Sequence, residues 1–379
     1  LASIFLAEVP FLNSMAIAAI SVVVVAVLVA LTLIPALFYW IGTAINWPEP
    51  LSSIIGRAKN GRGWRRLATY VMKQPMLFFI GTMAFLLLLS IPLLHIKTYT
   101  PTVVGLPRGV ESRQGFERLQ TDFVAGKMSP LNIIIEAPPG QTIWSADAVK
   151  RMYQLSQRLG SDSRVFKVEG IVNIDEQLTL ADYQKLYSSE GGLAGSDNIF
   201  AQMVSSYADN SGQGRQTLMR VTLVAEPGSL VSRNMVKEIR SRFIPAVFGN
   251  TGYRALVGGG AAGEVDLDRM IMTKLPLIIG IVCLVTFLVL IVLFRSILIP
   301  LKSIFMNILS VLASFGILIL VFQDGILNHI MKFKAPGGIS SVILVMLFSV
   351  LFGLSMDYEI FLTLRMKEEH DKGHSNEES

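Results

Sequence analysis

Long apolar runs constrain this chain more than any other feature, and the run from Ile339 to Leu364 is the most informative of them. It is long enough to cross a bilayer as an α-helix. Asp357 lies inside it, eight residues before Arg365, which is about 12 Å along a helix axis. A short Asp side chain cannot reach the water from that depth, and a lone charge there costs at least about 2.5 kcal/mol. We therefore expect this carboxylate to face the interior of a helix bundle and to have a function.

The residues around Asp357 predict a helix contact and a proton-transfer site. Ser349, Gly353 and Asp357 recur every four residues, which places them on one helix face. Ser349 and Gly353 are small, so we expect another helix to approach closely at this face. Tyr358 supplies a hydroxyl, and the Asp357–Tyr358 pair is a candidate proton relay. Glu359 lies about 200° further round the helix than Asp357 and is expected to face elsewhere. The alternative is that Asp357 only hydrogen-bonds a neighbouring helix.

Other apolar runs indicate a polytopic α-helical membrane protein. Hydrophobic residues make up 52% of the 379 residues, and charged residues make up only 16%, against about 25% in soluble proteins. Residues 15–40, 76–96, 275–294 and 305–322 are expected to span the membrane. Asn307 and Ser310 are polar positions within one of these spans, and they are expected to form hydrogen bonds between helices.

The distribution of charge and hydropathy divides the chain into six segments. They are partial and complete transmembrane helices in 1–41, a cytoplasmic basic linker with an interfacial helix in 42–75, a transmembrane helix in 76–96, an extracytoplasmic domain in 97–272, three transmembrane helices in 273–367, and a cytoplasmic disordered tail in 368–379. Residues 1–7 are interpreted as the end of a truncated membrane helix, and the whole chain as the middle of a longer protein.

The linker at 42–75 sets the predicted topology. It carries six cations and a single acid, and the cations are Arg57, Lys59, Arg62, Arg65, Arg66 and Lys73. Such an excess of positive charge beside membrane helices marks the cytoplasmic side. A polybasic switch that binds anionic lipids is the alternative interpretation of the same residues.

Residues 97–272 predict an α+β domain. Strands are expected at 131–136, 165–174, 216–225 and 254–257, and amphipathic helices at 145–159 and 232–248, the second of them disturbed at Pro245. This order, βαββαβ, is that of a ferredoxin-like split unit. Residues 178–212 are expected to form a helical insertion between the second and third strands.

Several classes of function are disfavoured. The charges of 97–272 are nearly balanced, so no nucleic-acid surface is expected. The stretch Gly258 to Gly263 lacks the Lys-Ser/Thr of a P-loop, so nucleotide binding is not expected. No metal-ligand spacing joins the four histidines, and Cys283 is the single cysteine. No cofactor is expected. Because no set of nucleophile, base and orienting group is visible, we do not expect an enzyme.

One pair of acids requires an interpretation of its own. Glu264 and Asp268 are four residues apart and share one face of a predicted helix. A catalytic carboxylate pair would need a substrate cleft that the sequence does not reveal. We therefore interpret these acids as a solvated or salt-bridged helix face.

The sequence also resembles a known family. Residues 353–362, GLSMDYEIFL, followed by a basic helix end, are similar to the tenth transmembrane segment of the MMPL transporters in the RND superfamily of proton-driven exporters. Residues 31–38, LTLIPALF, resemble the end of the sixth segment. RND porter domains are built from the βαββαβ unit. The resemblance implies that the chain is a central fragment, about segments 5 to 10, and that Asp357 and Tyr358 belong to a proton pathway.

The resemblance also implies a function and partners. It indicates a multi-pass protein of the bacterial cytoplasmic membrane that uses the proton motive force to export lipids or other hydrophobic compounds. Expected partners are membrane lipids, the substrate, the missing transmembrane helices of the same protein and, in a possible homo-oligomer, further copies of the chain. Two alternatives remain open: a SecDF-like proton-driven export motor and a non-transporting, sterol-sensing-like membrane scaffold. A second Asp-Tyr pair in the full-length sequence would favour the exporter.

Overall fold

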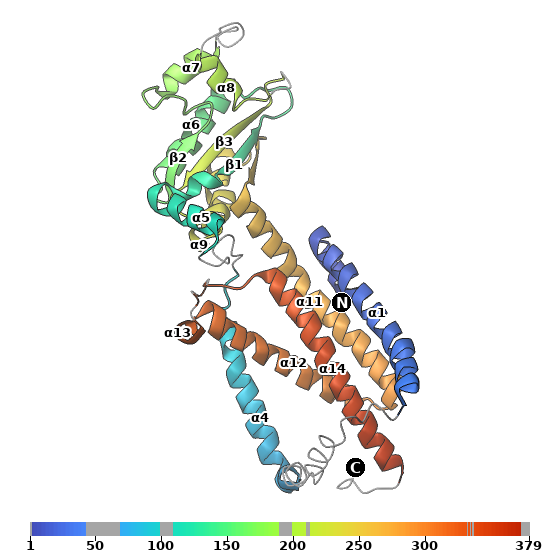
Figure 1. Ribbon diagram of the computed structural model, residues 1–379. Helices are drawn as coiled ribbons and strands as arrows, with labels where there is room; N and C mark the ends of the chain where they lie inside the picture. The colour runs from blue at the N-terminus through green and yellow to red at the C-terminus, as the bar shows by residue number, and fades with distance from the viewer. Residues whose placement is uncertain are drawn as a thin grey trace. The chain divides into compact units, whose positions relative to one another are not determined.

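The computed structural model describes residues 2–42, 69–98, 109–188, 199–209, 213–331 and 337–372, together with residues 333 and 335. The chain divides into two compact units (Figure 1). One unit comprises Leu1–Lys97 and Met270–Ser379, and the other comprises Thr98–Arg269. Most of the predicted basic linker, residues 43–68, and the last part of the predicted tail, residues 373–379, lie outside the described residues.

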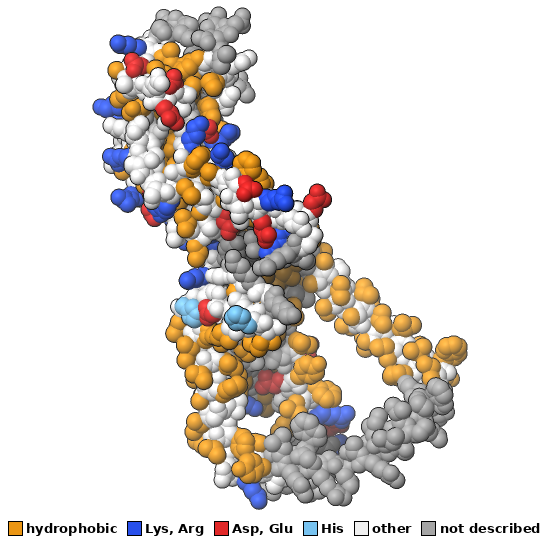
Figure 2. Space-filling model, turned by 60° about the vertical axis from the view of Figure 1, so that its left-hand side comes forward, with side chains coloured by type: hydrophobic (Ala, Val, Ile, Leu, Met, Phe, Trp, Pro, Cys, Tyr) orange, Lys and Arg blue, Asp and Glu red, His pale blue; other side chains and the backbone are white. Residues whose placement is uncertain are grey.

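The first unit is helical. Among the described residues, five helices are long and apolar enough to cross a membrane, as expected for a polytopic membrane protein. They are α1 (Pro10–Ile41), α4 (Pro75–Ser90) with its 3-10 extension η3 (Ile91–His95), α11 (Gly260–Phe294), which begins in the second unit, α12 (Leu298–Leu318) with its π-helical extension η7 (Ile319–Gln323), and α14 (Ser341–Asp371). The shorter elements are a 3-10 helix, η1 (Ala2–Ala7), and α13 (Asn328–Met331). Hydrophobic side chains cover much of the visible face of the long helices (Figure 2).

Helix α12 is central to this unit because it packs against both α4 and α14. Gly316 of α12 lies so close to α4 that a Cβ atom at this position would overlap the backbone oxygen of Leu89. Small residues allow helix backbones to approach in this way. Elsewhere on α12, Phe315 joins a buried cluster with Phe348 and Phe352 of α14. Helix α14 is thus held against α12 by large apolar side chains.

Polar side chains join η3 to η7. The Nε2 atom of His95 lies 3.0 Å from a carboxylate oxygen of Asp324. The side-chain amide of Gln323 donates to the backbone oxygen of His95 at 3.0 Å, and its oxygen accepts from the backbone N–H of Lys97 at 2.7 Å. These bonds satisfy backbone groups that a helix end otherwise leaves without partners.

The second unit is built on a four-stranded antiparallel sheet with the strand order β2-β3-β1-β4. Its main elements follow one another as strand, helix, strand, strand, helix, strand, which is the predicted order. They are β1 (Leu131–Glu136), α6 (Ala146–Gly160), β2 (Val165–Glu169), β3 (Gln216–Leu223), α9 (Leu230–Glu238) with η6 (Ile239–Phe243) and α10 (Ile244–Phe248), and β4 (Arg254–Gly258). Helix α5 (Glu111–Asp122) and the 3-10 helix η5 (Ala125–Met128) precede β1.

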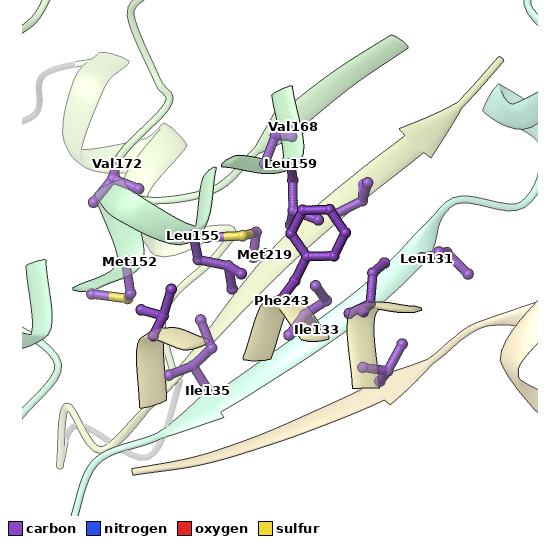
Figure 3. Packing of buried hydrophobic residues seen from close by; sticks show 14 of the residues in the cluster. Leu131, Ile133, Ile135, Met152, Leu155, Leu159, Val168, Val172, Met219 and Phe243 are labelled. Atoms are coloured by element: carbon purple, nitrogen blue, oxygen red, sulfur yellow. The ribbon is translucent and has the colours of Figure 1, made fainter. Parts of the chain in front are cut away.

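The core of this unit lies between one face of the sheet and the helices. Strand β1 points alternate side chains, including Ile133 and Ile135, into the core, as its period of two predicts. They meet Met152 and Leu155 of α6 together with Phe243 of η6 (Figure 3). Ser145 caps α6 by accepting a hydrogen bond from the backbone N–H of Ala148 at 3.2 Å, which satisfies a donor that the first helical turn otherwise leaves without a partner.

Two predicted elements differ from the observed ones. Strand β2 ends at Glu169 instead of Ile174, because the chain turns at Gly170, whose oxygen accepts from Asn173 N at 3.0 Å. The predicted helix at 232–248 is interrupted by a π-helical turn, η6, before α10 resumes at Ile244. Pro245 has no N–H to donate to the preceding turn, so the regular hydrogen-bond pattern cannot continue through it.

The predicted insertion at 178–212 contains α7 (Leu180–Ser188) and α8 (Ile199–Ser205), while residues 189–198 and 210–212 lie outside the described part. Helix α7 packs on α6. The hydroxyl of Tyr183 donates to the oxygen of Asp175 at 2.8 Å, and that of Tyr187 donates to the oxygen of Ile171 at 2.5 Å. Burial raises the pKa of both phenols, so they remain hydrogen-bond donors. The insertion is therefore anchored to the domain by buried tyrosines.

Candidate functional site

Helix α14 carries the predicted relay, and its two sides differ sharply. Phe348, Phe352 and Met356 recur every four residues and are buried against the rest of the helical unit. Asp357 is exposed, and so is Tyr358, whose exposed fraction is 71%. In the described part of the chain, neither side chain has a hydrogen-bond or ion-pair partner. The relay pair therefore lies on the exposed side of α14, opposite the buried residues, which we call the open side.

The three residues predicted to share one face are spread from the packed side to the open side. Ser349 is buried and donates to the oxygen of Val345 at 3.0 Å. Gly353 is exposed, and apart from its own stretch of α14 no described atom lies within 4 Å of a Cβ built at it. Four residues turn an α-helix by about 400°, so each step rotates the side chain by about 40°. Asp357 therefore points about 80° away from Ser349, and the close helix approach expected at Gly353 is not found among the described residues.

The second carboxylate of the span behaves differently. Glu359 is three residues after Met356, which places it on the packed side of α14, and it is partly buried. As expected, it faces away from Asp357. The two acids of this helix thus differ in burial: Glu359 is partly buried and Asp357 is exposed.

A buried amide sets the position of the relay segment. Asn307 of α12, 3% exposed, accepts a hydrogen bond from the hydroxyl of Ser355. Its amide nitrogen lies 2.9 Å from the sulfur of Met356. Both partners directly precede Asp357. The predicted hydrogen bond between helices at Asn307 is confirmed, but its partner Ser355 could not be chosen from the sequence, because no local pattern marks it.

These contacts define what the site can do. Asn307 and the aromatic residues fix the rotation of α14 about its own axis, and this rotation directs Asp357 away from α12. No group of three or more His, Cys, Asp or Glu residues within the described ranges could hold a metal ion.

Comparison with known proteins supports the family that the motif at residues 353–362 suggests. The model of the MMPL family matches residues 1–78 and 105–379. The "Mycolic acid-containing lipids exporter MmpL11" of Mycolicibacterium smegmatis is 27% identical over 372 residues, which cover 96% of this chain and 34% of the relative. In Mycobacterium tuberculosis, the "Heme uptake protein MmpL11" is 26% identical over 370 residues (97% and 34%), and the "Trehalose monomycolate exporter MmpL3" is 24% identical over 316 residues (83% and 29%).

The chain spans about a third of the length of these curated relatives. The family match includes the helix that carries Asp357 and the domain between α4 and α11, apart from its first residues. The resemblance noted in the sequence is therefore confirmed, and the chain belongs to the MMPL family.

Proposed function

We propose that this chain is the central part of a proton-motive-force-driven exporter of lipids or other hydrophobic compounds. The observation that carries the proposal is the exposed carboxylate of Asp357 on the open side of the apolar helix α14, next to Tyr358. Charged groups within a membrane are retained where they conduct protons or bind substrate. Two of the relatives are named as exporters of lipids that contain mycolic acid or of trehalose monomycolate, which supports the substrate class.

The proposed relay works by neutralising a charge at a helix contact. When Asp357 takes up a proton, the cost of placing it against another apolar helix falls by several kcal/mol. A helix supplied by the rest of the protein then packs against the open side of α14, and deprotonation releases it. Because Asn307 ties α14 to α12 and α12 packs on α4, the movement spreads to neighbouring helices. Tyr358 donates to the carboxylate or passes the proton on.

The second unit completes the proposed exporter as an extracytoplasmic, ferredoxin-like domain of the RND porter type. The strand order β2-β3-β1-β4 and the βαββαβ order support this classification. The excess of cations in the linker before α4 supports a cytoplasmic location for that side, and a single crossing of the membrane by α4 then brings residues 98–269 to the outside. Cysteine labelling that found the linker and this domain on one side of the membrane would refute the topology.

The decisive experiment uses the full-length protein in vesicles with an imposed pH gradient. Asp357→Asn keeps the shape of the side chain and removes its titration, so we expect normal insertion and loss of lipid export. Tyr358→Phe is expected to lose part of the activity. Glu368→Gln, at the exposed end of the same helix, is the matched control and is expected to export normally. Full export by Asp357→Asn would overturn the proton relay.

The alternative functions predict other outcomes in the same vesicles. A SecDF-like motor would drive protein translocation with the gradient and would leave lipid export unchanged in every variant. A sterol-sensing-like scaffold would show no dependence on the gradient. Because one relative is named for heme uptake, lipid and heme movement are both measured, in both directions across the vesicle membrane.

A further inference from the structure

The second unit contains a buried arginine in an unusual position. Arg233 lies on α9, and its side chain is 5% exposed. An arginine is almost never buried without partners, because removing its charge from water costs several kcal/mol. The surroundings of Arg233 therefore have to supply both negative charge and hydrogen-bond acceptors.

Two partners meet the guanidinium. Its Nη2 forms an ion pair with the carboxylate of Asp268 on α11, whose side chain is 10% exposed. Its Nη1 donates to the backbone oxygen of Thr98, and Nη2 lies 3.4 Å from the hydroxyl oxygen of the same residue. The salt-bridged interpretation of this helix face is thus confirmed for Asp268. The planar fork of the guanidinium allows one side chain to bind both partners.

The place of these partners in the chain makes the arrangement informative. Thr98 is the first residue of this compact unit, and Asp268 is the last but one. The chain arrives at Thr98 from η3, which ends at His95. It leaves through α11, which continues unbroken to Phe294 as a membrane span. Arg233 therefore binds both connections of this unit to α9: the segment that enters it, at Thr98, and the segment that leaves it, at Asp268 of α11.

The contact also has an unused acceptor. Glu264 lies one turn before Asp268 on α11, and its buried Oε2 atom has no hydrogen-bond partner among the described residues. The Nε atom of Arg233 is likewise buried without a partner there. The positive charge of Arg233 favours the ionised form of Glu264, whereas the negative charges of Asp268 and Glu226 disfavour it. A second carboxylate on the same face lets the guanidinium keep a negative partner if α11 moves relative to α9.

We propose that Arg233 is a positioning residue that passes movement of the membrane helices to the outer domain, with Asp268 as its present partner and Glu264 as a second one. The proposal rests on the proposed proton-driven export and adds the connection through which the relay drives the domain. When α11 moves, the domain follows because α9 is bound to it. The Arg233 side chain also binds Thr98, where the chain enters the domain from η3, so both connections to the membrane helices move together with α9.

The test measures lipid export and proton uptake separately, in the full-length transporter in vesicles with an imposed pH gradient. Arg233→Gln is expected to lower the lipid exported per proton by roughly 3- to 30-fold, while proton uptake stays close to that of wild type. If Arg233→Gln does not insert, Arg233→Lys keeps the charge but lacks the fork, and the same fall in the ratio is expected. A purely structural residue would lower both fluxes together.

A matched control exists between the same parts of the chain. Arg240 of η6 binds Asp266 of α11 at 2.5 and 2.8 Å, but this pair is more exposed and does not involve Thr98. Arg240→Gln is therefore expected to keep the wild-type ratio. Two results with the Arg233 variant that inserts would overturn this role for Arg233 and leave proton-driven export standing. One is a wild-type amount of lipid exported per proton, and the other is an equal loss of lipid export and proton uptake. If Asp357→Asn exports fully, it is the proposed function that fails.

Discussion

Arg164 joins the start of β2 to the end of α9, and we predict that Arg164→Met weakens the second unit in a pH-dependent way. Its Nε and Nη2 atoms bind the two oxygens of Asp162 at 2.9 and 2.7 Å. Its Nη1 and Nη2 atoms bind those of Glu238, both at 2.8 Å. Such two-point bonds are the stronger class of ion pair. The substitution removes both pairs and leaves two acids facing each other.

The size of the effect follows from the acids. Hydrogen bonds from the Arg164 side chain lower the pKa of Asp162 from 3.8 to about 2, which is equivalent to about 2.5 kcal/mol. The pKa of Glu238 is also lowered, chiefly by its hydrogen bonds to Arg164. Because Arg164 is 27% exposed and Asp162 17%, solvent screens part of this interaction. We therefore expect the free energy of unfolding to fall by about 1 to 2 kcal/mol at pH 7.

The pH dependence has a defined sign. A carboxyl group whose pKa is lower in the folded state stabilises the fold above its unfolded pKa, and this stabilisation is lost as the pH falls through the folded value. For Asp162 that window runs from about pH 4 down to about pH 2. The difference between wild type and Arg164→Met should therefore be constant above pH 5 and fall to about half at pH 3.

The measurement is urea unfolding of the purified protein in detergent, followed by the fluorescence of Trp144, with the other three tryptophans replaced by phenylalanine. Trp144 reports on the second unit because its ring lies 5.2 Å from that of Tyr187. Arg158→Met is the control, since Arg158 is exposed and forms no ion pair in the described part of the chain. A difference of the same size at pH 7 and pH 3, or an equal effect of Arg158→Met, would refute the reasoning.

Two further predictions concern packing. Gly316→Leu should prevent the approach of α12 to Leu89 of α4, so we expect this variant to elute as aggregate in size-exclusion chromatography. Gly280→Leu, at a position that no other described element approaches within 4 Å, should elute as wild type. Elution of Gly316→Leu at the wild-type volume would contradict the close contact. Leu155→Ala removes a fully buried side chain of α6 and should cost about 2 to 5 kcal/mol in the urea assay, against little change for the exposed Gln157→Ala; equal midpoints for the two variants would contradict the assigned core.

Local properties of the sequence determined much of this protein. The membrane spans follow from the length and hydropathy of each run, because a helix satisfies its own backbone hydrogen bonds in lipid. Strand β1 and the capped start of α6 follow from a period of two and from Ser145. The motif around Asp357 identified the family. Each of these signals is carried by residues close together in the chain.

Tertiary structure decided which sides of the elements meet. Nearly every position of α14 before Asp357 is apolar, so its sequence has no stripe that distinguishes a packed side from an open one. The contact with Asn307 of α12 and the aromatic cluster make that choice, and they leave Asp357 on the open side. The partners of Arg233 are 135 and 35 residues away in the sequence. No local pattern encodes such distant pairs, because they form only when the sheet and α11 bring the ends of the unit together.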